Sequence, residues 1–296
     1  MADRRLRPTI NTMRMQNLSR DTTHALPMRP VSLLVPRERV TMWWWTGLCA
    51  VSILNIALWL AAARLDLPES HYRSWQVALS GVYVAVCAFR SLFPRVDLER
   101  LCLWDTPLSA IFVGRFVATV AEMCFAMQCA LLLSRLSQIT GLAYLEALAL
   151  GIVPAILLAQ ILCWYAVATL NHLGHVMEEL LWVLMVTLLA VGFAGCWLHA
   201  QGVLKIVAAI GIVCCAGTAL LISFVDVPMY VSRWYQHRRA QQRYLPLVRG
   251  FFDTLARRHS TRAWHVWRRE VPWMTLYFSV GVWLSIGMTL LESMVP

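Results

Sequence analysis

Two charged side chains, Arg115 and Glu122, lie inside an apolar stretch of the sequence at residues 108–133. Roughly 20 apolar residues cross a bilayer as a helix, and a charge inside such a helix costs about 2.5–3.5 kcal/mol on insertion scales. A charge retained at this cost marks a candidate functional site. Glu122 is a candidate catalytic residue near the middle of the bilayer, and Arg115 is a candidate for binding an anionic group of a substrate.

The spacing of these two residues predicts that they do not pair directly. Glu122 follows Arg115 by seven residues, which places both on one face of a helix but about 10 Å apart along its axis. We expect Glu122 either to be protonated or to be hydrogen bonded to Gln160 or Tyr83. Other polar residues at a similar depth are expected to form interhelical hydrogen bonds, worth about 0.6 kcal/mol per pair: Asn55, Ser279 and Ser285.

A second polar cluster, with the sequence NHLGHVMEE, occupies residues 171–179 between the fourth and fifth apolar stretches. A helix beginning after Gly174 would place His175 on one face with Glu178 and Glu179. Imidazole and carboxylate groups at this spacing can bind zinc or iron, or act as an acid and a base. The candidate metal ligands are His172, His175, Glu178 and Glu179, of which His175 and Glu179 are also candidate catalytic residues.

The structural alternative for this cluster is a helix start. Carboxylates in a first helical turn interact favourably with the helix dipole, and the histidines would then be ordinary interfacial residues. Arg115 would pair with Glu178 or Glu179 under this interpretation. Asp226 and Tyr165 are predicted at a similar depth and are candidates for binding a substrate.

The composition places these residues in a membrane protein. Hydrophobic residues make up 59% of the 296-residue chain and charged residues 14%, whereas a soluble domain has about 25% charged residues. Seven apolar stretches are long enough to span a bilayer. The predicted fold is an all-α polytopic membrane bundle with seven transmembrane helices at residues 43–63, 75–93, 108–133, 147–170, 177–197, 203–225 and 273–291.

Arginine predicts the orientation of this bundle. The net charge of +10 comes almost wholly from arginine, because Lys205 is the only lysine. Arginines concentrate in the N-terminal arm, between the second and third spans, and between the sixth and seventh spans. With seven spans these segments share one side, which the positive-inside rule assigns to the cytoplasm. We expect the N-terminus inside and the C-terminus outside in a bacterial plasma membrane, with the mitochondrial inner membrane as the alternative.

Four regions follow from these patterns: an arginine-rich arm (1–42), a six-helix membrane region (43–227), a basic amphipathic segment (228–272) and a seventh span with a short outer tail (273–296). In the third region, Val248, Phe251, Phe252 and Leu255 recur at helical spacing with arginines on the other face. This pattern predicts a helix on the membrane surface that binds anionic headgroups. The alternative is a solvated basic loop that fixes the topology.

The remaining motifs exclude several classes of protein. The nine cysteines form no CxxC pair, and most lie inside apolar stretches, where we expect them to pack as small hydrophobes. No phosphate-binding glycine loop, GxSxG or HExxH motif is present. Lys205 lies at the end of a span rather than inside it, which excludes a retinal Schiff base.

These observations favour a membrane-embedded enzyme, with or without a metal ion, that acts on a lipid, quinone or isoprenoid-like substrate from the cytoplasmic leaflet. A non-catalytic subunit or assembly factor of a membrane complex is the first alternative, because small residues such as Gly192 and Gly195 suit helix packing. A proton-coupled transporter with Glu122 as the titrating group is the second. The expected partners are membrane lipids and either membrane proteins or a second copy of the chain; nucleic acid is not expected.

Overall fold

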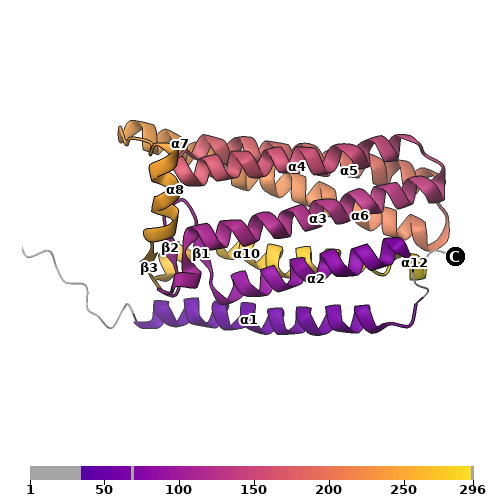
Figure 1. Ribbon diagram of the computed structural model, residues 1–296, viewed down its shortest axis with the longest axis horizontal. Coiled ribbons are helices and arrows are strands. Elements are labelled where there is room, and N and C mark those ends of the chain that lie inside the picture. Colours follow the sequence, from indigo (N-terminus) through magenta and orange to yellow (C-terminus); the bar gives the residue numbers. More distant parts are fainter. Residues whose placement is uncertain (1–34, 68–69, 295–296) are drawn as a thin grey trace, which may run out of the picture.

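Seven long helices run side by side in the computed structural model, which describes residues 35–67 and 70–294 (Figure 1). Each helix is long and apolar enough to span a bilayer, so the chain is a multi-pass helical membrane protein, as predicted. The predictions for the arm at residues 1–34 lie outside the described residues. The spans are α1 (Val35–Arg64), α2 (His71–Leu92), α3 (Ile111–Thr140), α4 (Tyr144–Thr169), α5 (His172–His199), α6 with α7 (Gly202–Leu221 and Val227–Arg239), and α10 with α11 (Val271–Leu276 and Val282–Met288).

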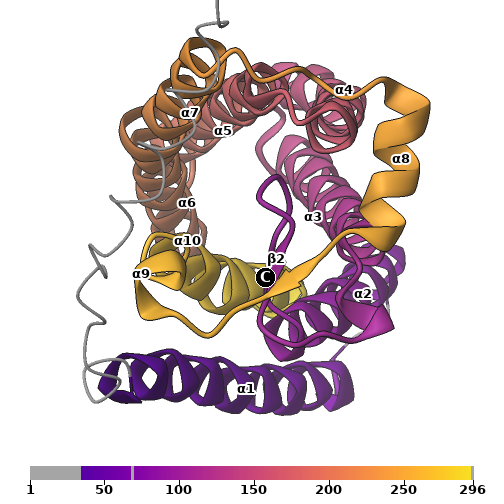
Figure 2. The ribbon, with the colours of Figure 1, turned by 90° about the vertical axis from the view of Figure 1, so that its left-hand side faces the viewer.

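The spans form a ring with α1 outside it (Figure 2). Helices that are consecutive in the chain pack on one another from α1 to α6, and α11 packs back on α2. One apolar core lies among α3, α4, α5 and α6, and a second lies among α1, α2 and the last span. α1 leaves apolar side chains such as Ile53 and Leu54 exposed, which suits contact with lipid tails that are as apolar as leucine.

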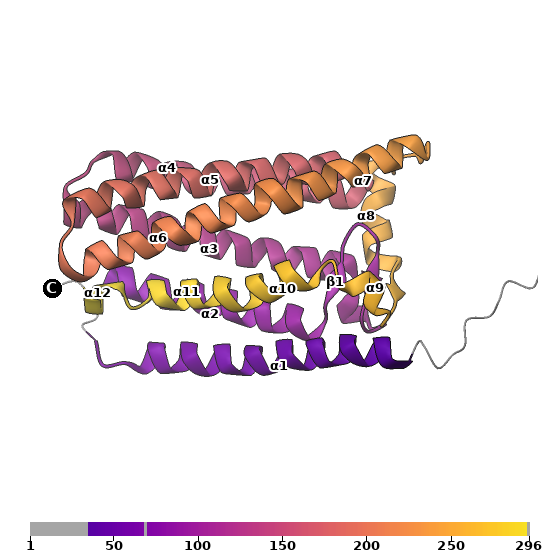
Figure 3. The same ribbon diagram turned by 180° about the vertical axis from the view of Figure 1, so that it is seen from behind.

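The described chain starts and ends at opposite ends of the ring, as an odd number of crossings requires (Figure 1 and Figure 3). The start of α1, the loop after α2 and the segment after α7 gather at one end, which we call the mouth end. The opposite end carries the α3–α4 and α5–α6 turns and the short helix α12 (Leu291–Met294). The arginine-rich loops of the described chain therefore share one end; that this end faces the cytoplasm stays a prediction.

Two spans contain a π-helical turn: η3 (Ile222–Asp226) joins α6 to α7, and η4 (Tyr277–Gly281) joins α10 to α11. A π turn inserts an extra residue into a helix and is frequent at functional sites. The helix of the sixth span continues through η3 to Arg239, well beyond the predicted end at residue 225. The region boundary predicted at residue 227 therefore falls inside a continuous helix.

A loop between α2 and α3 folds into the mouth end of the ring (Figure 2). This mouth loop, residues 93–110, contains strands β1 (Arg95–Val96) and β2 (Leu101–Cys102) and the short helix η2 (Pro107–Ser109). β1 and β2 pair antiparallel, and β2 pairs in parallel with β3 (His259–Ser260). Helix α8 (Leu247–Ala256) and the short helix α9 (Trp264–Trp267) complete the mouth end.

Arg100 holds the mouth loop in place. Its buried side chain donates hydrogen bonds to the carbonyl oxygens of Asp97 and Val167, and its Nε lies 3.0 Å from Oδ2 of Asp253 on α8. The backbone of Arg100 has φ = 56°, a left-handed conformation that residues other than glycine seldom adopt. The three contacts offset this strain and connect the loop to both α4 and α8.

Candidate functional site

The charged pair in the third span forms a direct salt bridge, so the prediction that Arg115 and Glu122 are too far apart was wrong. Nη2 of Arg115 lies 2.9 Å from Oε1 of Glu122. Both residues are on α3 and are only 6% and 7% exposed. The axial separation of about 10 Å between their backbones is closed because the two long side chains share one face of the helix and extend toward each other.

Gln160 of α4 connects this pair to the neighbouring span, as predicted for Glu122. Its Nε2 donates to Oε2 of Glu122 at 2.5 Å, and its Oε1 accepts a hydrogen bond from Nη2 of Arg115 at 2.9 Å. Thr119 donates to the same Oε1, and Trp164 donates to Thr119. Additional hydrogen bonds of this kind are what make a buried ion pair tolerable. Nε of Arg115 has no hydrogen-bond partner among the described residues.

A second buried cluster lies close to the tight turn between α4 and α5. Nδ1 of His175 is 2.6 Å from Oε2 of Glu178 and 3.8 Å from Sγ of Cys163. All three residues are buried, and one potential ligand atom from each lies within 4.8 Å of the others. We call this group the cysteine–histidine–glutamate cluster.

The α4–α5 turn positions this cluster. The side chain of Asn171 caps α5 by accepting a hydrogen bond from the N–H two residues later. α5 therefore begins at His172, whereas the prediction placed its start after Gly174. Gly174 packs directly on α4, where an added Cβ would lie 2.8 Å from Cβ of Ala166. This close approach brings His175 against α4.

The geometry of the cluster suits a metal ion better than a nucleophilic triad. In a triad, the imidazole uses one nitrogen for the nucleophile and the other for the carboxylate. Here Cys163 and Glu178 both face Nδ1 of His175, so three donors converge on one point. Ligand atoms around a tetrahedral zinc ion lie about 3.4–3.6 Å from one another. The distance between Nδ1 of His175 and Oε2 of Glu178, now 2.6 Å, would therefore have to increase by about 1 Å.

Aromatic side chains cover the imidazole of His175. The ring of Tyr230 on α7 stacks on it, with centroids 4.8 Å apart and planes inclined by 21°. His172 lies beside Tyr230 and His237, with ring centroids 6.5 and 6.2 Å away, and its Nδ1 has no hydrogen-bond partner in the described chain. The structure therefore places His172 next to the cluster without bringing it into the set of converging atoms.

Two further carboxyl groups, those of Glu179 and Asp226, interact with the cluster or with each other. Glu179 interacts electrostatically with Glu178 and Asp226, and within the described ranges none of these three forms a salt bridge with an arginine or lysine. Arg115 also interacts with Glu178, but its salt bridge is to Glu122. Carboxylates inside membrane spans are costly unless they are paired. A divalent cation held by the cluster would add positive charge beside these carboxyl groups.

Other polar residues have structural partners, and one candidate lies away from the cluster. Tyr165 is 42% exposed on α4 and has no contact with the cluster in the described structure.

Asn55 donates to the carbonyl of Phe278 and accepts from Trp283, which confirms the predicted interhelical bond. The prediction was also correct for Ser285, which contacts Ser80 and Gln128, and wrong for Ser279, which donates to Thr275 of its own span.

The mouth loop covers the cluster from the mouth end. Leu98 of this loop packs in an apolar group with Cys163 and Val167. Next to Leu98 in the chain, Glu99 forms a 2.8 Å salt bridge with Arg233 of α7. Burial raises the pKa of the Glu99 carboxyl, and the Arg233 guanidinium opposes this shift. A water-soluble molecule approaching from this end would have to displace the loop to reach the cluster.

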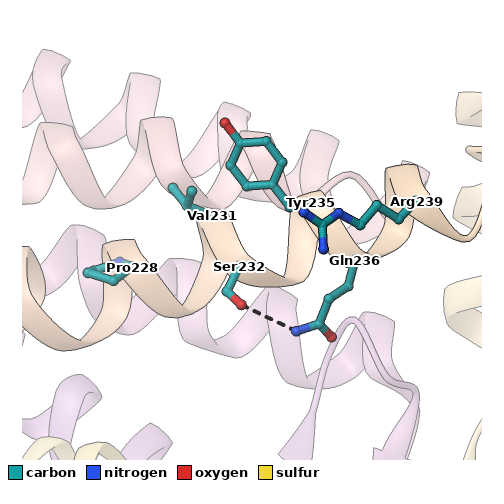
Figure 4. A pocket seen from close by; sticks show the side chains of 6 residues that line it. All are labelled: Pro228, Val231, Ser232, Tyr235, Gln236 and Arg239. Atoms are coloured by element: carbon teal, nitrogen blue, oxygen red, sulfur yellow. Dashed lines mark hydrogen bonds between the residues drawn. The ribbon is translucent and has the colours of Figure 1, made fainter.

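A surface hollow lies along α7, outside the cluster (Figure 4). Within it, Gln236 donates a hydrogen bond to Ser232 at 3.2 Å. The helical spacing places this hollow on a different face of α7 from Tyr230. It contains none of the predicted site residues and is lined by Pro228, Val231, Ser232, Tyr235, Gln236 and Arg239.

Cys163 is the residue that sequence reasoning missed. A single cysteine in an apolar stretch carries no motif, and it was assigned to packing. The available signal was its distance from the α4–α5 turn: in an antiparallel helix pair joined by a short turn, residues within two turns of the connection on either side face each other. Cys163 and His175 are 12 residues apart across that turn.

No protein-family model matches this chain, and no curated protein or solved structure matches it. The assignment of the site therefore depends on the geometry described above.

Proposed function

We propose that this protein is a membrane-embedded, zinc-dependent hydrolase that acts on a lipid-like substrate. The observation that supports this most directly is the convergence of Cys163, His175 and Glu178 on one point between α4 and α5. Three protein ligands with a fourth position for water or substrate are typical of catalytic zinc sites. A thiolate among the ligands favours zinc or iron over magnesium or calcium.

The neighbouring side chains suit hydrolysis. Zinc lowers the pKa of a bound water to about 7, so that hydroxide forms at neutral pH. Glu179, which lies beside Glu178 in the acidic group, would accept the proton from that water. Zinc held by Cys163, His175 and Glu178 would thus supply a nucleophile for a carbonyl carbon or phosphorus atom of the substrate, and Glu179 would pass the proton to the departing oxygen of the cleaved bond. Arg115, whose Nε has no hydrogen-bond partner in the described part of the chain, would bind an anionic group of the substrate.

The surroundings of the cluster favour a substrate that arrives from the bilayer. The mouth loop closes the approach from the mouth end, where Leu98 packs on Cys163. On α5, by contrast, Leu173 and Met177 flank His175 in sequence and are exposed on the outside of the bundle, where lipid tails would contact them. Lipid-like esters and phosphoesters partition into this environment and carry a bond that a metal-bound hydroxide can cleave.

The salt bridge in the third span disfavours the transporter alternative. A proton carrier would have to protonate Glu122 during each cycle, which would leave Arg115 as an uncompensated charge inside the bundle. Breaking a buried pair in this way is strongly unfavourable. The subunit alternative does not require converging ligands, and metal analysis separates it from the enzyme.

Metal content tests the proposal. We expect purified protein to contain stoichiometric zinc, and we expect Cys163→Ser and His175→Ala to lose it. Matched controls are Cys129→Ser, a buried cysteine of α3, and His199→Ala at the far end of α5, which should both keep the metal. Fluorogenic lipid esters and phosphoesters in nanodiscs then test for hydrolysis, with His175→Ala as the blank. Folded wild-type protein without zinc or iron would overturn the proposal, and stable co-purifying partners would then favour the subunit.

A further inference from the structure

Helix α8 carries an apolar face that the described structure does not cover. The helix lies across the mouth end (Figure 1) and at the rim of the ring (Figure 2). It packs on α4 through Gly250 and Thr254, its buried residues, and a Cβ added at Gly250 would overlap the carbonyl group of Ala168. The contact with α4 therefore uses the small side chains of α8 and leaves its large apolar ones partly or largely exposed.

The large apolar side chains of α8 point away from this contact. Val248 is 72% exposed and Phe252 is 63% exposed, and both lie on the same side of the helix. Helical spacing places most of this apolar face more than a quarter turn from the buried Gly250, with Leu247 closer to it, and places Arg249 on the polar face. The exposed apolar face consists of Leu247, Val248, Phe251, Phe252 and Leu255.

The contacts of α8 set its depth relative to the spans. Gly250 meets Ala168, in the last turn of α4, and the ring of Phe251 packs edge-on against Phe112, in the first turn of α3, with centroids 5.2 Å apart. Both contacts are at the ends of membrane spans, where hydrocarbon gives way to headgroups. An apolar face at this level and at the rim of the ring faces the membrane interface.

Free arginines accompany the apolar face. Arg243 and Arg249 are exposed, and neither forms a salt bridge within residues 35–67 and 70–294. Arg257, by contrast, is paired with Asp253 of the same helix at 3.0 Å. Guanidinium groups without a carboxylate partner are suited to bidentate contacts with phosphate. The charge of this surface therefore complements anionic phospholipid headgroups.

We infer that α8 is an interfacial anchor that inserts its apolar face into the leaflet at the mouth end and binds anionic phospholipid through Arg243 and Arg249. The apolar contact applies to any bilayer, whereas the arginines make the attachment stronger in anionic membranes. This role is independent of the cysteine–histidine–glutamate cluster, because none of the residues concerned belongs to that cluster. The competing occupants of the face are a second copy of this chain and another protein.

Hydrogen–deuterium exchange of the full chain in nanodiscs tests the anchor. We expect amides in 247–256 to exchange more slowly in phosphatidylglycerol-containing nanodiscs than in phosphatidylcholine, by up to about 30-fold for two arginines near an anionic surface. High salt and the Arg243→Gln/Arg249→Gln variant should each remove the difference. Both residues are exposed, so this variant should fold, and exchange in α4 serves as the control. Equal exchange in the two lipids would overturn the role of the arginines.

Photo-crosslinking identifies what covers the apolar face. We expect p-benzoylphenylalanine in place of Phe252 to attach to phospholipid in the same nanodiscs. The matched control is Arg257, which is exposed, lies about 140° around the helix from Phe252, and should give little lipid adduct when replaced in the same way. Crosslinks from position 252 to a second chain or to another protein, without lipid adducts, would overturn the anchor.

Discussion

Arg115 and Glu122 lie nearly two turns apart on α3, and their side chains meet at 2.9 Å inside the bundle. Gln160 of the neighbouring helix is hydrogen bonded to both. The pair therefore joins two spans and neutralises two charges at once. Its energetic value depends on both partners being present, since a single buried charge is far more costly than a pair.

We predict that breaking this pair destabilises the protein strongly. Glu122→Gln and Arg115→Gln should each cost about 3–5 kcal/mol, because each leaves one charge buried without its partner. Arg115→Gln combined with Glu122→Gln leaves neither charge buried and should recover most of that loss. Unfolding in detergent, analysed as a double-mutant cycle, gives the coupling free energy.

A more exposed salt bridge, between α3 and α12, provides the control for this cycle. Arg135 of α3 is salt bridged to Glu292 at 3.2 Å, and its side chain is 37% exposed. Arg135→Gln should therefore cost at most about 1 kcal/mol. Similar losses from Arg135→Gln and Arg115→Gln would contradict the buried salt bridge.

We predict that the α4–α5 contact does not tolerate a side chain at Gly174. Gly174→Ala would place a Cβ 2.8 Å from Cβ of Ala166 and 2.9 Å from the carbonyl oxygen of Leu162, so α5 must shift. The expected results are a lower melting temperature and a loss of bound zinc. Gly151→Ala is the matched control, because no atom lies within 4 Å of an added Cβ there. Equal melting temperatures and zinc contents for the two variants would show that the helices are not held this closely.

Metal removal should destabilise the wild-type protein reversibly. A ligand that binds only the folded state at a concentration of 100 times its dissociation constant adds about 2.7 kcal/mol to stability. Chelation should therefore lower the melting temperature, and Zn²⁺ should restore it where Mg²⁺ does not, since the ligand set contains sulfur and nitrogen. His175→Ala should melt at the same temperature with and without chelator. A shift of equal size in that variant would place the effect of the chelator elsewhere.

Reporter fusions test the orientation. The segment after α7 and the α5–α6 turn lie at opposite ends of the ring (Figure 3). The arginine distribution predicts that a reporter after Gln241 is cytoplasmic and that one after Gln201 is outside. The reverse result would show that the positive-inside rule fails for this chain. Two reporters on one side would instead contradict the odd number of crossings between them.

The spans were predictable because a bilayer demands a long apolar stretch, which a sequence shows directly. Their ends were less predictable. Asn171 and His172 look like a loop from their polarity, but Asn171 caps a helix that starts at once. The π turn η3 was not predictable either, because it adds a residue to the helix without a sequence signature. Its effect is to continue the sixth span as far as Arg239.

The site was partly predictable. His175 and Glu178 are close in sequence, so helical spacing alone predicts their contact. Cys163 comes from another helix, and its contribution depends on how closely α4 and α5 approach at Gly174. The Arg115–Glu122 bridge was missed for a different reason: backbone spacing was compared without the lengths of the two side chains. Sequence spacing shows neither the distance at which two helices pack nor the length over which two side chains can extend toward each other.

The parallel pairing of β2 with β3 has a mechanical consequence. Leu101 pairs with His259 and Cys102 with Ser260, and Arg100 and Asp105 of the same loop bind Asp253 and Arg258. These bonds fasten the mouth loop to α8 and to the segment that follows it. A displacement of α8 must therefore either carry the mouth loop with it or break this set of bonds. Because linkage is reciprocal, whatever stiffens one of these two segments also restrains the other.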